Sequence, residues 1–147
     1  MNYQVIKTFG PESGLSCSFR QWRAQSHCRF LHGYALGVRI TFAANELDEH
    51  NWVYDFGNLK WLKDWLAEQF DHTTLIAADD PELNTFKQLA EQGLIQLRIL
   101  PHVGCEQFAK WICDFVAPKV AAETHNRVQV QSVEVFEHGA NSAVALP

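Results

Sequence analysis

The stretch Asp55-Phe-Gly-Asn-Leu-Lys-Trp-Leu-Lys-Asp-Trp-Leu-Ala-Glu-Gln-Phe-Asp71 decides the fold class, because the hydrophobic period changes there to that of a helix. The apolar residues that recur at helical spacing are Leu59, Leu62, Leu66 and Phe70. Asp55 or Asn58 is placed to cap the first turn. The stretch therefore predicts an amphipathic helix that ends near Asp71.

The sequence before this helix has the pattern of strands. Tyr3–Phe9 and Leu15–Phe19 are short runs rich in strand-forming residues, and the glycines, proline and serine between them favour a turn. We expect these two runs to form a hairpin. Tyr34–Phe42 predicts a further strand, with Leu36, Val38 and Ile40 on one face.

The sequence after the helix mixes both kinds of element. The expected helices are Pro81–Gln92, stopped by Gly93, and Cys105–Val116; the expected strands are Leu94–Leu100, Val128–Phe136 and Ser142–Leu146. Strands followed by helices and then strands predict an α+β domain, a sheet with helices on one face. The open edges of such a sheet favour a homo-oligomer that pairs them.

Composition restricts the function. The 147 residues are 47% hydrophobic and carry a net charge of −5, which excludes a disordered chain and a general attraction to nucleic acid. No apolar run reaches the roughly 18 residues of a membrane span. Met1–Phe9 lacks the pattern of a signal peptide, so we expect a cytoplasmic protein of one domain over residues 1–147 with reduced cysteines.

The segment His27-Cys-Arg-Phe-Leu-His-Gly-Tyr34 brings a thiol, two imidazoles and a guanidinium together between two predicted strands. Neutral imidazole is the commonest ligand of zinc-like metals, and nearby cations lower the pKa of a thiol. The segment therefore indicates a metal or thiol site. A polar loop with a buried cysteine is the alternative.

Two further candidates lie elsewhere in the chain. Asp71 precedes His72 at the end of the predicted helix, where a carboxylate can orient an imidazole for proton transfer or act only as a surface feature. Glu137 follows Val133 and Val135 on the inward face of the last long strand. A carboxylate there needs donors, such as the paired N–H groups of a heterocycle, unless the strand ends before it.

Taken together, these pieces resemble the family of 6-pyruvoyl tetrahydropterin synthases and 6-carboxytetrahydropterin synthases over nearly the whole chain. The segments that carry the resemblance are Cys28–Gly33, Val53–Lys60, Asp71-His72, Glu106–Ile112 and Glu137. The resemblance implies a tunnelling fold, with four antiparallel strands and two main helices on one face. It also implies a barrel-shaped oligomer, commonly a hexamer, with active sites between subunits.

The resemblance implies an enzyme that acts on 7,8-dihydroneopterin triphosphate. Cys28 would be the catalytic thiol, and Asp71 and His72 would complete its proton relay. Glu137 would anchor the amino-pyrimidine edge of the pterin, with Glu106 in support. Arg20, Arg23 and Arg29 lie near the thiol in sequence and supply the cations that a triphosphate needs.

The chain departs from the family at the zinc site, which usually has three histidines. Phe19 and Tyr34 stand at two of these positions, and His32 is retained. A catalytic zinc needs about three protein ligands. We therefore expect a divalent metal, zinc or another, to be held by His32 and His27, with a sulfur from Cys28 or Cys17.

Three other departures concern the substrate. In Val103-Gly-Cys-Glu106 a cysteine stands where the family has a hydroxyl, His138 follows Glu137 where threonine is common, and the insertion Ala77–Leu100 is long. The leading function is a metal-dependent lyase that makes 6-carboxytetrahydropterin, releasing triphosphate and acetaldehyde, on the route to queuosine. The alternatives are 6-pyruvoyl tetrahydropterin synthase activity and a non-catalytic pterin-binding oligomer whose metal site has decayed.

Overall fold

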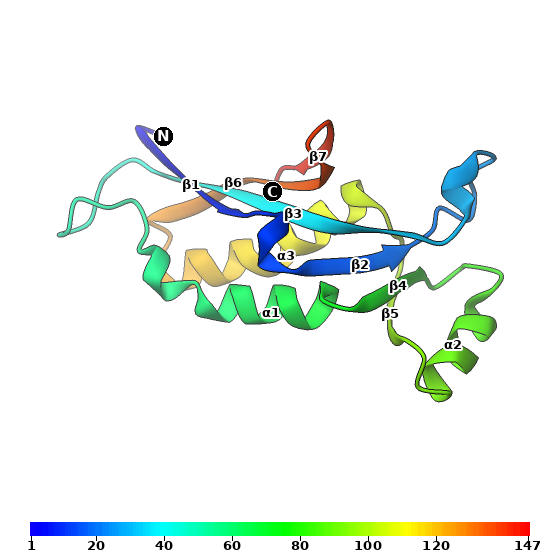
Figure 1. Cartoon of the computed structure of the whole chain (residues 1–147). Helices are drawn as coiled ribbons and strands as arrows, with labels where there is room; N and C mark the ends of the chain where they lie inside the picture. The colour runs from blue at the N-terminus through cyan, green and yellow to red at the C-terminus, as the bar shows by residue number, and fades with distance from the viewer.

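The computed structural model describes residues 1–147 and contains one mixed sheet with three α-helices (Figure 1). The strands are β1 (Tyr3–Phe9), β2 (Leu15–Phe19), β3 (His32–Ala44), β4 (Thr73–Ala77), β5 (Gln96–Leu100), β6 (Val128–His138) and β7 (Asn141–Ala145). The helices are α1 (Lys60–Phe70), α2 (Leu83–Glu91) and α3 (Cys105–Glu123). The α+β class is confirmed, but the sheet has seven strands and is larger than the four predicted.

The long strand β3 organises the sheet, whose order is β5-β4-β2-β3-β6-β7 with β1 also on β3. Two strands lie along one edge of β3. Strand β2 pairs with the first part of β3, from His32 to Leu36, and β1 pairs with the second part, from Val38 to Ala44. Both are antiparallel to β3 and follow one another along it, so they cannot pair with each other. The predicted hairpin between Tyr3–Phe9 and Leu15–Phe19 is therefore wrong.

Strand β6 carries a bulge that explains its apolar pattern. Thr41 pairs with Ser132 and Phe42 pairs with Val130, which leaves Gln131 without a partner. The extra residue shifts the alternation by one position. Val130 and Val133, which a regular strand would place on opposite faces, are therefore both buried.

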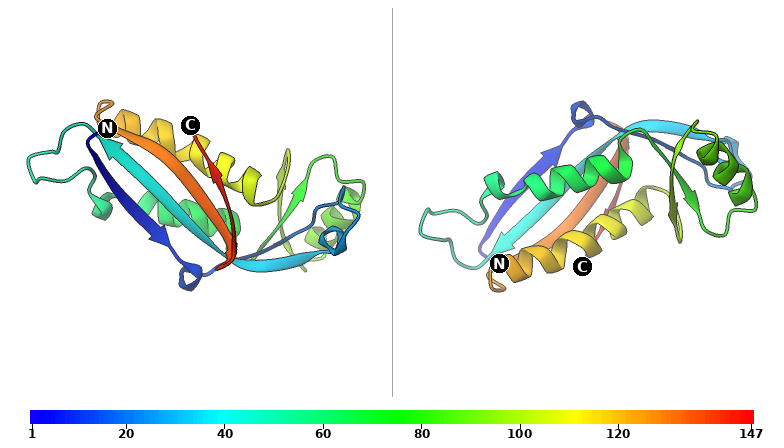
Figure 2. Two further views of the ribbon diagram at one scale, coloured as in Figure 1. Left: turned by 90° about the horizontal axis from the view of Figure 1, so that it is seen from above. Right: turned by 90° about the horizontal axis from the view of Figure 1, so that it is seen from below.

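Helices α1 and α3 lie side by side on one face of the sheet, as Figure 2 shows from below. The face of α1 that contacts the sheet carries Leu62, Leu66 and Phe70, as the periodicity predicts. Trp65 of α1 stacks on Phe115 of α3, with ring centroids 4.0 Å apart, which joins the two helices. None of the helices is long and apolar enough to cross a bilayer.

The chain between Ala77 and Leu100 forms a separate corner of the molecule. Strand β4, which the sequence pattern did not predict, is fully buried and runs parallel to β2, and β5 runs parallel to β4. Helix α2 lies beyond these strands, at the end of the sheet opposite the N-terminus (Figure 1). It is shorter than the predicted Pro81–Gln92 and buries only Phe86.

Candidate active site

Cys28 lies in a short 3-10 turn, His27–Arg29, within the loop that joins β2 to β3. Ser26 caps this turn, since its Oγ accepts a hydrogen bond from the Cys28 backbone N–H at 3.3 Å. The Cys28 carbonyl accepts from the backbone N–H of Gln21 at 2.9 Å, which closes the base of the loop. Cys28 is half-buried, whereas the other three cysteines are buried, so it is the accessible thiol of the chain.

The buried cysteines are held as thiols. Burial raises the pKa of Cys17 to about 12. Burial also raises the pKa of Cys105, and the neighbouring carboxylates of Glu137 and Glu106 raise it further. A thiol whose pKa lies far above neutrality is a poor nucleophile, so neither residue competes with Cys28 for thiolate chemistry.

Three side chains meet where the resemblance predicts the metal. Phe19 pairs with His32 across the β2–β3 ladder, and Tyr34 lies on the same face of β3 as His32. The ring centroids are 5.2 Å apart for Phe19 and His32, 5.4 Å for His32 and Tyr34, and 6.0 Å for Phe19 and Tyr34. A benzyl ring offers no donor atom, so these residues do not fit a zinc that needs three protein ligands.

The proposed ligands His27 and His32 are not gathered into a metal site within the chain. The Nδ1 atom of His32 lies 2.7 Å from the Phe30 carbonyl, which can only accept, so this nitrogen carries the proton. His27 is exposed in the 3-10 turn. Ligand atoms of three candidate residues come within 4.8 Å of one another only at Asp48, Glu49 and His50. That cluster, in which Glu49 and His50 are exposed and Asp48 is half-buried, follows the C-terminal end of β3.

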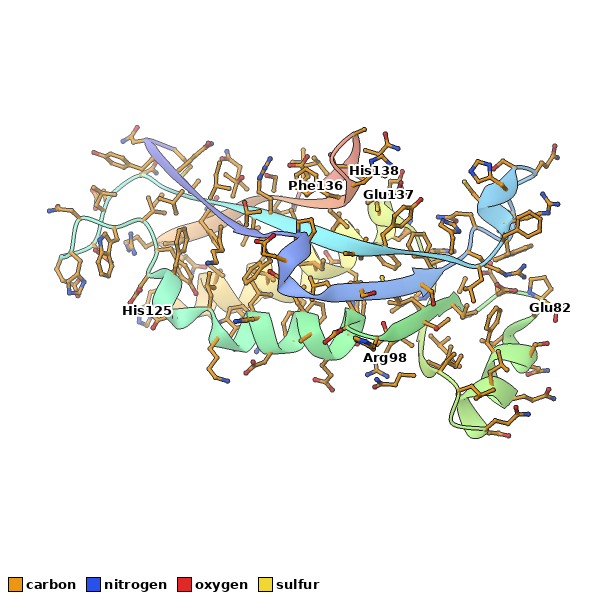
Figure 3. The ribbon with its side chains drawn as sticks, viewed as in Figure 1. Glu82, Arg98, His125, Phe136, Glu137 and His138 are labelled. Carbon is orange, nitrogen blue, oxygen red and sulfur yellow. The ribbon has the colours of Figure 1, made fainter.

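Glu137 and Glu106 line one cavity of about 450 Å³, between the start of α3 and the turn from β6 to β7. Its remaining lining residues are Cys105, Ala140, Asn141, Ser142 and Ala143. Glu106 lies in the first turn of α3, where a negative charge is favourable. Figure 3 labels Phe136, Glu137 and His138 together at the β6–β7 turn. The structure thus brings the two glutamates together in one cavity.

The Glu137 side chain is not placed by simple alternation. The register between β6 and β7 shifts between Phe136 and His138, so that Glu137 sits in a bulge. Such bulges redirect side chains at the ends of strands. Glu137 is half-buried, whereas Val133 and Val135 are fully buried. The carboxylate therefore leaves the core and reaches the cavity.

Tyr34 lies near the β6–β7 turn that bounds this cavity. Burial raises the pKa of the Tyr34 phenol, and the Glu137 carboxylate raises it further. His138 also faces Tyr34, with ring centroids 6.2 Å apart. Tyr34, which the sequence pattern identified only as a replaced histidine, thus lies beside His32 and faces the β6–β7 turn that carries Glu137.

Asp71 and His72 form the predicted pair, although away from Cys28. The Asp71 Oδ1 and His72 Nδ1 atoms are 2.5 Å apart, which fixes the proton on Nδ1. The His72 backbone N–H donates to the Ser16 carbonyl at 2.7 Å, whereas Gln21 contacts Cys28. Ser16 lies near the start of β2 and Gln21 follows its end, so the pair and the loop that carries Cys28 lie beside opposite ends of this strand.

The three arginines near the thiol differ in their partners. Arg20 is paired with Asp80, with Nη2 and Oδ1 2.6 Å apart, and Arg23 is paired with Asp79 at 2.7 Å. Arg29 lies over the ring of Phe30, 4.2 Å from its centroid, and forms no ion pair. Arg29 is therefore the one of the three whose charge is not already balanced.

Comparison with known proteins gives the family context of this site. The family model described as 6-pyruvoyl tetrahydropterin synthase matches residues 11–146. The chain is 43% identical over 60 residues to the 6-carboxy-5,6,7,8-tetrahydropterin synthase of Rickettsia conorii. That match covers 40% of this chain and 44% of the relative, less than half of its length. The protein of the same name from Aquifex aeolicus is 27% identical over 97% of both chains.

Solved structures agree with the sheet and helix arrangement. An uncharacterised protein from Wolinella succinogenes matches with a TM-score of 0.83 at 22% identity, covering 98% of this chain and 97% of the other. The 6-pyruvoyl tetrahydropterin synthase of Plasmodium falciparum matches with a TM-score of 0.67 at 14% identity, covering 97% and 96%. These likenesses confirm the tunnelling fold.

Proposed function

Because the chain belongs to the 6-pyruvoyl tetrahydropterin synthase family, we propose that it is a lyase that converts 7,8-dihydroneopterin triphosphate to 6-carboxytetrahydropterin. One water would be consumed, triphosphate and acetaldehyde would be released, and the product would serve queuosine synthesis. The observation that carries the proposal is the position of Gln21, whose backbone N–H donates to the Cys28 carbonyl and whose side chain donates to the Val103 carbonyl. Val103 lies just before Cys105 and Glu106, which line one cavity with Glu137, so the loop that carries the thiol is fastened beside the two glutamates.

Glu137 and Glu106 would hold the pterin. A carboxylate with two free oxygens can accept both N–H groups of an amino-pyrimidine edge, a paired geometry that favours one orientation. The cavity of about 450 Å³ lies within the size range of small-molecule sites. Cys105, which stays protonated, offers a weak S–H donor in place of the family's hydroxyl.

Cys28 would transfer the proton next to the side chain that is removed, with His72 oriented by Asp71 completing the relay. Because one chain leaves this pair away from Cys28, His72 of a second chain would have to supply it. The strands β1, β5 and β7 each keep one unpaired edge. Open edges favour strand pairing between copies, which supports a homo-oligomer, a hexamer in the family arrangement.

Metal dependence is part of the proposal, with zinc as the first candidate and other divalent metals as alternatives. His27 and His32 are the proposed ligands, and no step of the reaction is assigned to the metal because Phe19 and Tyr34 do not complete a site. Replacing both histidines with alanine should lower the metal content of the purified protein. Unchanged metal content in the His27→Ala, His32→Ala variant would remove this assignment.

The setting of the proposed enzyme follows from the same residues. We treat residues 1–147 as one domain of the family and place the protein in the cytoplasm, where its four free cysteines would stay reduced. The proposed partners are the pterin triphosphate and further copies of the chain. Arg29, which lacks a carboxylate partner, is the cation best placed for the triphosphate.

The carboxy product is favoured over the pyruvoyl product because the curated relatives carry the name 6-carboxy-5,6,7,8-tetrahydropterin synthase. A second candidate, a pterin-binding protein without turnover, is favoured by the phenylalanine and tyrosine at the metal positions. Mass spectrometry of the products from 7,8-dihydroneopterin triphosphate separates these functions. The test is run on protein as isolated, after chelation, and after addition of zinc, manganese or iron.

A further inference from the structure

The loop that carries Cys28, residues 20–31, is fastened by its own first residues. The Gln21 backbone N–H donates to the Cys28 carbonyl at 2.9 Å, and the Gln21 side chain donates to the Val103 carbonyl at 3.0 Å. The Nη1 atom of Arg20 donates to the Arg29 carbonyl at 3.4 Å. We call residues 20–31 the thiol loop. Gln21 thus holds the carbonyl of Cys28 itself, and Arg20 holds the carbonyl of the next residue, Arg29.

The rest of the Arg20 guanidinium is bound to Asp80. Nε donates to Oδ2 at 2.8 Å and Nη2 donates to Oδ1 at 2.6 Å, a two-point contact that fixes the plane of the guanidinium. The Asp80 side chain is 1% exposed and that of Arg20 is 19% exposed. Asp80 Oδ1 also accepts from the Glu82 backbone N–H at 2.8 Å. The carboxylate is thus fixed from both sides.

Asp80 belongs to the connection between β4 and α2, within the insertion Ala77–Leu100. Phe86, the one buried residue of α2, lies beside the same guanidinium, with the Arg20 Cζ atom 6.0 Å from the ring centroid. Figure 1 places this connection and the thiol loop at the same end of the sheet, and Figure 3 labels Glu82 within it. The insertion therefore reaches the thiol loop through Arg20.

The neighbouring carboxylate, Asp79, makes a similar contact without burial. It accepts from Arg23 at 2.7 Å and from Trp22 Nε1 at 3.3 Å, but the side chains of Arg23 and Asp79 are 70% and 41% exposed. Exposed ion pairs contribute little to stability or geometry. Asp79 is therefore a matched control for Asp80, with the same charge and loop and without the buried two-point contact.

We propose that Asp80 is a positioning residue for Cys28, acting through Arg20, and that the insertion Ala77–Leu100 holds the thiol loop in its working geometry. This inference rests on the proposed role of Cys28 in the reaction. The guanidinium of Arg20 is committed to Asp80 and to the loop backbone, so its task is to place the thiol. Arg29, whose carbonyl Arg20 binds, is placed by the same contact.

The test compares Asp80→Asn with Asp79→Asn by the rate at which iodoacetamide labels Cys28 in the folded protein. Peptide mass mapping identifies the labelled cysteine, and circular dichroism confirms the fold. We call the two-point contact between Arg20 and Asp80 the clamp. Its loss frees the thiol loop, so Asp80→Asn should raise the labelling rate of Cys28 about fivefold, while Asp79→Asn leaves it within about twofold. Equal rates in folded Asp80→Asn and in the unmodified protein would overturn the inference.

Labelling needs no turnover, so it separates this inference from the proposed function. If the enzyme turns over, Asp80→Asn should also lower kcat about tenfold and leave KM within about twofold, since a misplaced thiol impairs the chemical step more than binding. A change confined to KM would contradict a positioning role. If the unmodified protein shows no turnover, the proposed function fails, and the labelling rates alone decide whether the contact between Arg20 and Asp80 holds the thiol loop.

A second variant covers the case in which Asp80→Asn does not fold. Arg20→Lys keeps the charge beside Asp80 but cannot make the two-point contact, so it should also raise the labelling rate of Cys28. The double variant Arg20→Gln, Asp80→Asn should label at the rate of its single variants, because both remove one interaction. If Cys28 in folded Arg20→Lys is labelled at the same rate as in the unmodified protein, the inference that Asp80 positions the thiol loop through Arg20 is overturned.

Discussion

Phe19 lies directly opposite His32 in the β2–β3 ladder, with the two ring centroids 5.2 Å apart. Tyr34 completes a triangle with sides of 5.2, 5.4 and 6.0 Å. Three imidazoles around one tetrahedral metal at about 2.1 Å have ring centroids about 5 Å apart. The backbone of this chain thus keeps the spacing of a three-histidine site, whereas two of the side chains lack the imidazole.

Restoring the imidazoles should create a metal site. The variant Phe19→His, Tyr34→His should bind zinc about a hundredfold more tightly than the unmodified chain, measured by competition with a chromophoric chelator. Adding His32→Ala to this variant should remove the gain, because the third ligand is lost. Zinc affinity that does not rise in the folded double variant would show that the triangle does not have the geometry of a metal site.

Cys28→Ser should abolish turnover of 7,8-dihydroneopterin triphosphate, with a loss of about a thousandfold or more, because a hydroxyl is a much weaker acid and nucleophile than a thiol. Product formation followed by mass spectrometry measures the loss. Cys113→Ser, a buried cysteine outside the site, is the control and should keep its activity. Turnover that survives in Cys28→Ser would move the proton transfer to another group.

Glu137→Gln should weaken pterin binding, because the amide replaces one acceptor oxygen with a donor that faces the N–H groups of the substrate. KM should rise about tenfold or more, as expected for loss of a charge-assisted hydrogen bond. Glu134→Gln is the matched control, since Glu134 lies on the same strand and bonds to Arg39 and Ser142. Equal KM values for the two variants would remove Glu137 from the pterin site.

The buried pair of Arg20 and Asp80 predicts a pH dependence of stability. The Arg20 hydrogen bond lowers the pKa of Asp80 below its ordinary value, so the carboxylate stabilises the fold above the unfolded pKa of about 3.9. This contribution is lost as the pH falls through the folded pKa. Between about pH 6 and about pH 3, the Tm of Asp80→Asn should therefore fall less than the Tm of the unmodified chain.

At neutral pH the buried pair of Arg20 and Asp80 predicts that loss of Asp80 lowers the free energy of unfolding. Removing one partner of a buried ion pair leaves the other charge unpaired, so Asp80→Ala should destabilise the fold by about 3 kcal/mol. Asp79→Ala should change the free energy of unfolding by less than about 1 kcal/mol, because its pair is exposed. Denaturant titrations measure both. Equal effects would mean that burial does not distinguish the two pairs.

The separation of Asp71 and His72 from Cys28 predicts a site shared between chains. Cys28→Ser and His72→Ala should each be inactive, whereas oligomers assembled from an equal mixture should recover about a quarter of the activity through sites with both residues intact. Refolding the two variants together and assaying the mixture measures this. A mixture that stays inactive after verified assembly would place both residues in one chain.

The helix α1 and the strands β1 and β2 could be predicted from the sequence because their apolar periods are local properties. Leu62, Leu66 and Phe70 face the sheet as their spacing requires. The partner of β1 could not be predicted in this way, since it depends on β3 being long enough for two strands end to end. Strand β4 was missed because Thr73–Ala77 is buried on both faces and shows no alternation.

Some residues of the candidate site could likewise be predicted from local sequence, and others could not. Cys28, Glu106 and Glu137 carry recognisable residue types in a recognisable order, and the structure places the two glutamates in one cavity. The grouping of Tyr34 with Phe19 and His32 could not be identified because it depends on the register of β2 against β3. Asp80 was missed because its only sequence signal is an acidic pair before Pro81, whereas its partner Arg20 lies 60 positions away.

The most direct test of the central claim is mass spectrometry of the products formed by purified protein from 7,8-dihydroneopterin triphosphate. The account predicts 6-carboxytetrahydropterin together with acetaldehyde and triphosphate, and none of these from Cys28→Ser. Formation of the 6-pyruvoyl product would contradict the assigned specificity. Binding of the pterin without any product, with each added metal, would contradict the claim that this chain is a lyase.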